Sequence, residues 1–307
     1  MSMTTNFEDT PHAIMTPQLI SKHPKMGTTI FTVMSGLAAE TGAVNFGQGF
    51  PDFECDPVLV NAVTQAMQEG LNQYPLMPGA MPLRVAVSDK IEKLYGHRYD
   101  ANTEITITAG ATQAILTIIL AIVQPGDEVI TTSYTYVATC EVIALLQLTP
   151  VFIEVNPNTF TMDPNAIEKV ITSKTKAIVP VHLYGQCADM EEILAGAKKH
   201  NLYVIEDTAQ AIGAQYTFSD GKKAAAGCMG DIGTTSFFPS KNLGCYGDGG
   251  AIFTNDDNLA EKLRMVANHG QKVRYYHDIV GVNSRLDTIQ AAILNCKLPH
   301  LDAYSAA

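Results

Sequence analysis

One lysine and one upstream carboxylate are the residues of this chain that point most directly to chemistry. Lys241 stands between the short apolar run 235–238 and a glycine-rich segment that ends at residue 250. Asp207 lies 34 residues earlier, where the apolar stretch 202–205 ends. A lysine that reacts with an aldehyde and a buried carboxylate that holds a ring cation are the two protein groups that pyridoxal phosphate (PLP) chemistry requires. The pair therefore predicts a PLP site.

The neighbours of Lys241 supply what a Schiff-base lysine needs. Such a lysine reacts as the neutral amine, so burial or a nearby positive charge must lower its pKa. The segment 236–240 offers an apolar wall and, in Ser236, a hydroxyl for a phosphate. Glycines after the lysine let the backbone approach a ligand closely. The simpler alternative is a surface lysine in a polar loop, and these neighbours favour the reactive role over it.

Asp207 has two interpretations of its own. An aspartate at the end of a strand is often only the N-cap of a following helix. As a ligand group it would pair with the protonated pyridine nitrogen and keep the cofactor an electron sink. The downstream lysine favours the second role. Gln210 would then reach the phenolic oxygen of the ring, and Tyr136 would stack on the ring unless it is a core aromatic.

The segment Ala109–Thr112 joins an apolar strand to an apolar helix. Small residues at a helix N-terminus expose free N–H groups and the positive end of the helix dipole to an anion. Gly110, Ala111 and Thr112 therefore form a candidate phosphate cup. Strand–glycine–helix joints are common, so this signal depends on the lysine and the carboxylate.

Apolar runs of strand length alternate with helical segments from residue 104 onward. The runs at 105–108, 128–132, 177–183 and 202–207 lack a polar–apolar alternation, which is typical of parallel strands buried on both faces. We predict an α/β fold with a mainly parallel sheet and helices on both faces. Ligands bind beyond the carboxyl ends of the strands in such sheets, where Gly110 and Asp207 fall.

Three segments organise the chain. Residues 1–45 are polar and contain prolines and one short apolar stretch, so we predict that they form an arm with a short helix. We predict that residues 46–290 form the PLP-binding large domain. We predict that residues 291–307 form the start of an interdomain helix.

Composition excludes several classes of partner. The net charge of −11 argues against nucleic acid and against anionic membranes. No two of the six cysteines stand at a metal-ligand spacing, so we expect no metal site and reduced thiols. The first 25 residues hold no signal-peptide core and no apolar run reaches 18 residues, which predicts a cytoplasmic protein that does not enter membranes.

Residues 128–307 closely resemble the DegT/StrS family of PLP-dependent sugar aminotransferases. The resemblance rests on five stretches of this sequence: Asp127–Thr139, Val181–Gln186, Val204–Ala211, Ser236–Asn242 and Gly281–Asp287. It implies the large domain of the type I PLP-dependent transferase fold.

The resemblance also implies a role for each matched residue. Lys241 forms the Schiff base and Asp207 holds the pyridine nitrogen. Tyr136 and Ala209 lie on opposite faces of the ring, with Gln210 near its phenolic oxygen. By the same similarity Ser236 binds the phosphate. Asn283 reaches the phosphate of the neighbouring subunit's cofactor, which implies a homodimer with shared active sites.

Residues 22–127 resemble class I/II aminotransferases of the methionine/glutamine type instead. This resemblance rests on the stretches Lys25–Phe31, Asn45–Phe53, Asn72–Gly79 and Thr108–Ala114. It implies that Tyr74 reaches the partner subunit's phosphate and that Gly110 to Thr112 cup the phosphate of their own subunit. We therefore expect a chimera with a change of family near 125–128. We also expect a chain truncated before the small C-terminal domain, since both families continue beyond this length.

The expected reaction is transamination. Lys241 acts as general base and acid, glutamate is the amino donor, and a nucleotide-linked keto-sugar is the acceptor. Three alternatives stay open: an amino-acid aminotransferase of the methionine type, a sugar dehydratase, and a PLP-binding fragment with impaired catalysis. Dehydratases of the sugar family carry histidine in place of the Schiff-base lysine, so Lys241 counts against that alternative.

Overall fold

The computed structural model describes residue 28 and the ranges 30–46 and 53–306. The chain forms two compact units, residues 1–55 and 56–307. The first unit contains helix α1 (Ile30–Thr41), which agrees with the short helix predicted there. The predicted arm over residues 1–27 lies outside the described residues. The domain boundaries predicted at residues 45 and 290 stay predictions.

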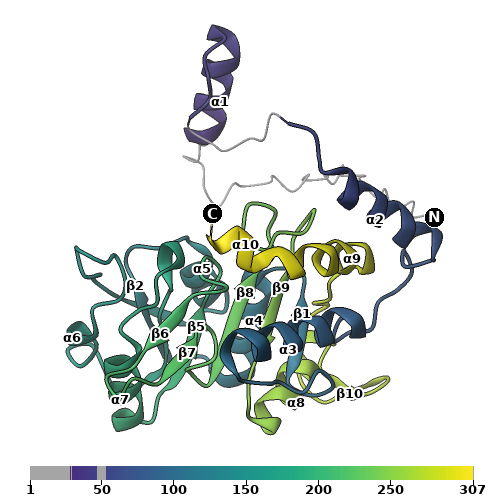
Figure 1. The fold of residues 1–307 in the computed structure, drawn as a ribbon. Coiled ribbons are helices and arrows are strands. Elements are labelled where there is room, and N and C mark those ends of the chain that lie inside the picture. Colours follow the sequence, from purple (N-terminus) through teal and green to yellow (C-terminus); the bar gives the residue numbers. More distant parts are fainter. Residues whose placement is uncertain (1–27, 29, 47–52, 307) are drawn as a thin grey trace, which may run out of the picture. The chain divides into compact units, whose positions relative to one another are not determined.

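A seven-stranded sheet forms the centre of the second unit (Figure 1). Its strands in spatial order are β1 (Ile105–Thr108), β9 (Gly250–Phe253), β8 (Ile232–Ser236), β5 (Tyr203–Asp207), β4 (Thr175–Val179), β2 (Glu128–Thr132) and β3 (Thr149–Ile153). Within this sheet β9 alone pairs antiparallel with both of its neighbours, and the other pairs are parallel. Two short hairpins, β6–β7 (Gln215–Thr217 and Lys223–Ala225) and β10–β11 (Gln271–Val273 and Tyr276–His277), lie outside it.

Helices cover both faces of the sheet, as predicted. One face packs against α4 (Ala111–Ile122), α5 (Ala138–Leu145) and α8 (Asp257–Ala267). The opposite face packs against α6 (Pro164–Ile167) and α7 (Met190–His200) over one half and against α3 (Met81–Tyr95), α9 (Thr288–Lys297) and α10 (Leu301–Ala306) over the other. A short 3-10 helix, η2 (Leu298–His300), joins α9 to α10, and helix α2 (Pro57–Gln68) packs on α9.

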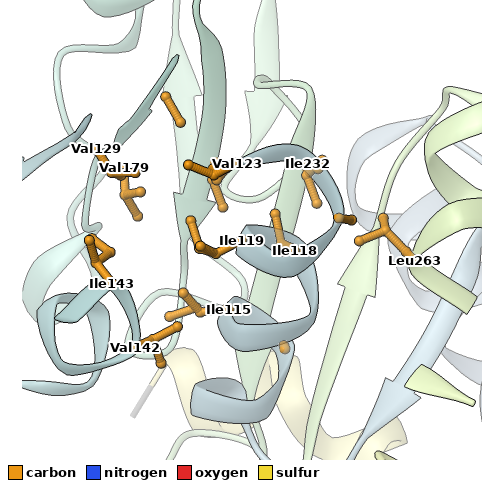
Figure 2. Close-up of a cluster of buried hydrophobic side chains, with 14 of the residues drawn as sticks. Ile115, Ile118, Ile119, Val123, Val129, Val142, Ile143, Val179, Ile232 and Leu263 are labelled. Atoms are coloured by element: carbon orange, nitrogen blue, oxygen red, sulfur yellow. The ribbon is translucent and has the colours of Figure 1, made fainter. Parts of the chain in front are cut away.

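Alternate side chains of each strand enter different cores. In β4, Ala177 and Val179 pack beneath α4, whereas Ile178 belongs to the core beneath α7. Figure 2 shows the first of these cores, where Ile115 and Ile119 of α4 lie among side chains of the neighbouring strands and helices. Helix α4 is apolar nearly all round because it is buried between the sheet and its neighbouring helices.

Local signals set several boundaries correctly. Helix α2 begins where predicted because Asp56 accepts a hydrogen bond from the N–H of Val58 at 2.8 Å and Pro57 occupies the first helical position. Helix α3 ends at Gly96, whose φ of 68° lies in the left-handed region. The sequence pattern predicts one helix over 135–148 and another over 165–172, but both are shorter in the structure: α5 spans Ala138–Leu145 and α6 spans Pro164–Ile167.

Cys140, Cys187, Cys228, Cys245 and Cys296 have free thiols, and the reduced state of the cysteines stays a prediction. Among the helices of the described ranges, none combines the length and the apolar character needed to cross a membrane.

Candidate active site

A cavity of about 430 Å³ lies at the carboxyl edge of the sheet, beyond the ends of β1, β5 and β8. This is where a mainly parallel sheet is expected to bind a ligand. Nine of the predicted site residues line it: Gly110, Ala111, Thr112, Tyr136, Asp207, Ala209, Gln210, Ser236 and Lys241. The fold therefore gathers residues that are up to 131 positions apart in the sequence into one site.

Asp207 is the last residue of β5 and is only 5% exposed. Its two carboxylate oxygens are held from different sides. Oδ2 accepts a hydrogen bond from the hydroxyl of Thr139 at 2.9 Å, and Oδ1 accepts one from the N–H of Ala209 at 3.0 Å. A carboxylate fixed by two donors presents a defined negative charge to the cavity. It does not cap a helix, because residues 209–213 form turns.

Lys241 lies in the segment 237–249, which connects β8 to β9. Its side chain is half-buried in the wall of the cavity. Burial lowers the pKa of its ammonium group, and the opposing attraction of the Asp207 carboxylate is the smaller effect. The neutral amine is therefore more accessible than in an ordinary lysine, as a nucleophile requires.

The N-terminus of α4 forms another wall of the cavity. Gly110 precedes the helix with a φ of 124°, so a side chain at this position would strain the backbone. The first-turn N–H groups of Ala111 and Thr112 have no partners within the helix and carry its positive dipole end. Gly250 of β9 packs directly on this turn: a Cβ there would lie 2.6 Å from the carbonyl carbon of Gly110.

Ser236 ends β8 and is nearly buried beside the cavity. Its hydroxyl oxygen accepts a hydrogen bond from the N–H of Phe238 at 3.2 Å, which leaves the hydroxyl proton to donate elsewhere. Together with the helix N-terminus, it supplies neutral donors suited to an anion.

Gln210 connects the cavity to the segment that follows β4. Its Oε1 atom accepts a hydrogen bond from the backbone N–H of Tyr184 at 3.0 Å. The amide NH₂ group therefore carries the donors that remain for a ligand. Tyr136, in contrast, is 71% exposed at the cavity, so it is not the core aromatic of the alternative interpretation.

A buried hydrogen-bonded pair lies beneath the strand end that carries Asp207. The Nε2 atom of His182 lies 2.9 Å from Oε2 of Glu206, and both side chains are fully buried. The other ring nitrogen of His182 accepts the N–H of Ala188, so Nε2 carries the proton that Glu206 accepts. Three backbone N–H groups, from Gly227, Met229 and Gly230, also donate to Glu206. This network fixes the backbone next to Asp207 and faces away from the cavity lining.

Tyr74 and Asn283 are not among the residues that line this cavity. Tyr74 is 88% exposed, and the guanidinium carbon of Arg285 lies 5.3 Å from its ring centre. Asn283 is exposed as well. Both were expected to act on the cofactor of a partner subunit, and this assignment stays a prediction.

The structure adds residues that the sequence did not single out. Asp248, Phe238 and Ser240 line the cavity from the segment that carries Lys241. Thr139 contributes the hydroxyl that holds Asp207 from 68 positions away. The sequence could have indicated Asp248, Phe238 and Ser240, because they are close to Lys241 in the chain. Nothing in the local sequence marks Thr139.

The profile of the DegT/DnrJ/EryC1/StrS aminotransferase family matches residues 88–307. A "pleiotropic regulatory protein" of Geobacillus stearothermophilus is 58% identical over 186 residues, which cover 60% of this chain and 48% of the relative. The UDP-2-acetamido-2-deoxy-3-oxo-D-glucuronate aminotransferase of Pseudomonas aeruginosa is 49% identical over 233 residues, which cover 76% of this chain and 60% of the relative. The chain thus spans about half of the length of these curated relatives.

The crystal structure of DesV from S. venezuelae in complex with a ketimine intermediate is similar to this chain with a TM-score of 0.69 at 34% identity. The similarity covers 88% of this chain and 65% of that one, which confirms the predicted fold class. The family match begins at residue 88, within the segment that resembled class I/II enzymes, so the comparisons do not support a chimera with a change of family near 125–128. The chain belongs to the DegT/DnrJ/EryC1/StrS aminotransferase family.

Proposed function

We propose that this protein is a PLP-dependent aminotransferase that transfers an amino group from glutamate to a nucleotide-linked keto-sugar. One observation carries the proposal: a single cavity joins Lys241, whose ammonium pKa is lowered by burial, to the fixed carboxylate of Asp207. Aminotransferases of this family use PLP, and the relative from Pseudomonas aeruginosa is named for a nucleotide-linked keto-sugar.

The donor set of the cavity fits PLP. A phosphate needs hydrogen-bond donors, and the first turn of α4 with Ser236 provides them. A protonated pyridine nitrogen needs a buried anion, which is Asp207. The close contact between Gly250 and Gly110 keeps side-chain atoms away from the turn that would receive the phosphate.

When bound, PLP supplies the electron sink that stabilises negative charge developing at Cα of an amino donor. Lys241 Nζ would hold the cofactor through its aldehyde carbon and, once free, would move the proton from Cα of the donor to that carbon. Asp207 holds the proton on the ring nitrogen, and Thr139 and Ala209 fix the direction of that carboxylate. Tyr136 and Ala209 bound the space for the ring, and Gln210 offers its NH₂ group to the ring's phenolic oxygen.

Two further expectations belong to the proposal. The homodimer with shared sites, in which Tyr74 and Asn283 reach the partner's cofactor, stays a prediction, as does the cytoplasmic location. The methionine-type and impaired-fragment alternatives make different predictions for the half-reactions, so one experiment separates them.

That experiment is a spectral titration of the purified chain. PLP is expected to give the visible absorbance band of a lysine-bound cofactor in the wild-type chain and none in Lys241→Ala. Glutamate should remove the band, and UDP-2-acetamido-2-deoxy-3-oxo-D-glucuronate should restore it. A band that forms but survives glutamate indicates the impaired fragment, and loss of the band with methionine alone indicates the methionine-type enzyme. A Lys241→Ala variant that keeps the band would refute the assignment of the lysine.

A further inference from the structure

Three aromatic residues extend the site along the sheet edge, and we name them the aromatic rim: Tyr134, Phe160 and Tyr184. They follow the carboxyl ends of β2, β3 and β4, the strands on the far side of β5 from Lys241. The hydroxyl oxygens of Tyr134 and Tyr184 lie 3.0 Å apart, and the ring centres of Tyr134 and Phe160 lie 5.6 Å apart. The rim is therefore a cluster built by three separate segments.

The rim is exposed although its members are large and aromatic. Tyr184 is 68% exposed, Tyr134 is 47% exposed and Phe160 is 45% exposed. Single exposed apolar residues are ordinary, but a contiguous exposed aromatic cluster beside a cavity is typical of a binding surface. The rim contributes little to the core, because most of the surface of Tyr184 is exposed.

The backbone of Tyr184 is the second independent observation. Its φ of 56° lies in the left-handed region, which a bulky aromatic residue adopts only where the surroundings impose it. Burial does not impose it here, since the side chain is exposed. In this conformation its N–H donates a hydrogen bond to Oε1 of Gln210, and Gln210 lines the cavity. The conformation of Tyr184 is thus tied to the group that faces the cofactor ring.

The chemistry of the rim suits a sugar. Aromatic faces pack against the C–H face of a pyranose, and tyrosine hydroxyls exchange hydrogen bonds with its hydroxyl groups. The hydroxyl pair of Tyr134 and Tyr184 offers both donor and acceptor positions next to those faces. The cavity itself is committed to the cofactor, so the acceptor has to rest on what borders it.

We propose that the aromatic rim binds the sugar ring of the amino acceptor and that Tyr184 is its specificity-determining residue. This inference rests on the proposed function, because it assumes a keto-sugar acceptor. Gln210 holds Tyr184 in place from the cofactor side, so binding of the cofactor and orientation of the sugar are coupled through one side chain.

The test separates the two half-reactions of Tyr184→Ala and Tyr184→Phe. Loss of the ring should raise the KM for UDP-2-acetamido-2-deoxy-3-oxo-D-glucuronate by about tenfold, as expected for one aromatic contact. Loss of the hydroxyl alone should raise it less. The rate at which glutamate removes the visible band of bound PLP should not change in either variant. Tyr304→Ala is the matched control, because Tyr304 is a similarly exposed tyrosine on α10, away from the cavity lining.

Each outcome decides the proposal. An unchanged acceptor KM in Tyr184→Ala overturns it while leaving the proposed function intact. An equal loss in both half-reactions assigns Tyr184 a structural role and also overturns it. Weaker inhibition by UDP alone would place the contact on the nucleotide, against the assignment to the sugar ring. If the wild-type chain itself fails to react with glutamate, the proposed function fails, whatever Tyr184 does.

Discussion

The hydrogen bond between Thr139 and Asp207 gives the sharpest test of how the site is built. Thr139→Val replaces the hydroxyl by a methyl group of similar size, so the buried position stays filled. Oδ2 of Asp207 then loses its donor, because the described contacts of that atom are limited to this hydroxyl. A hydrogen bond to a charged group contributes about 1.5–3 kcal/mol, and the unpaired carboxylate oxygen stays buried after the change.

We therefore expect Thr139→Val to lower the free energy of unfolding by about 1.5–3 kcal/mol and the Tm by roughly 3–12 °C. Thr139→Ser is the matched control: it keeps the hydroxyl and removes one methyl group, at a cost of about 1 kcal/mol. Urea unfolding of the chain without PLP measures both values. The Kd for PLP should rise by roughly tenfold in Thr139→Val, because the carboxylate loses one of its two fixed donors.

A double-mutant cycle with Asp207→Ala isolates the pair. Without the carboxylate the threonine hydroxyl has lost its acceptor, so Thr139→Val should cost little in that background. Equal destabilisation by Thr139→Val and Thr139→Ser, or the same cost of Thr139→Val with and without Asp207, would refute the reasoning.

Three other changes have defined outcomes. Gly250→Ala places a Cβ against the carbonyl carbon of Gly110, so it should weaken PLP binding at least tenfold, as measured by titration of the visible band. The control Gly36→Ala, whose Cβ meets nothing within 4 Å, should leave PLP binding unchanged. Lys241→Met should raise the Tm by roughly 1–3 °C at neutral pH, because folding lowers the pKa of this amine and the unfolded chain binds its proton more strongly. This gain in Tm should shrink as the pH approaches the ordinary lysine pKa of 10.5. A gain that grows with pH would contradict the reasoning. Glu206→Gln forces an amide NH₂ group toward backbone N–H donors, so it should lower the free energy of unfolding in urea by about 3–5 kcal/mol. The control Glu168→Gln, at an exposed position, should lower it by less than about 1 kcal/mol.

Much of the site followed from the sequence because its key residues stand at the ends of strands. Asp207 and Gly110 were placed by the strands predicted at 202–207 and 105–108, which correspond to β5 and β1. Lys241 was placed by its glycine-rich neighbours. The structure brings all three to one cavity.

The remainder depended on contacts that local sequence does not encode. Residues 135–137 have a helical pattern, yet they form no helix: Thr135 and Tyr136 line the cavity, and α5 begins only at Ala138. The role of Thr139 depends on a strand 68 residues away. Tyr184 was predicted to follow a strand, but its left-handed backbone depends on the side chain of Gln210. In each case tertiary contacts outweigh local propensity.

The antiparallel strand β9 has a consequence for how this site can vary. If the next strand were parallel, the chain would have to cross to the opposite edge of the sheet before that strand began. Because β9 runs antiparallel to β8, both ends of the segment 237–249 stay at the edge that binds the ligand. Five residues of that short segment consequently line the cavity: Phe238, Ser240, Lys241, Asp248 and Gly249. Insertions or deletions there would reshape the reactive side of the site without altering the register of the sheet. Related chains can thus diversify their chemistry at this one connection while the scaffold stays constant.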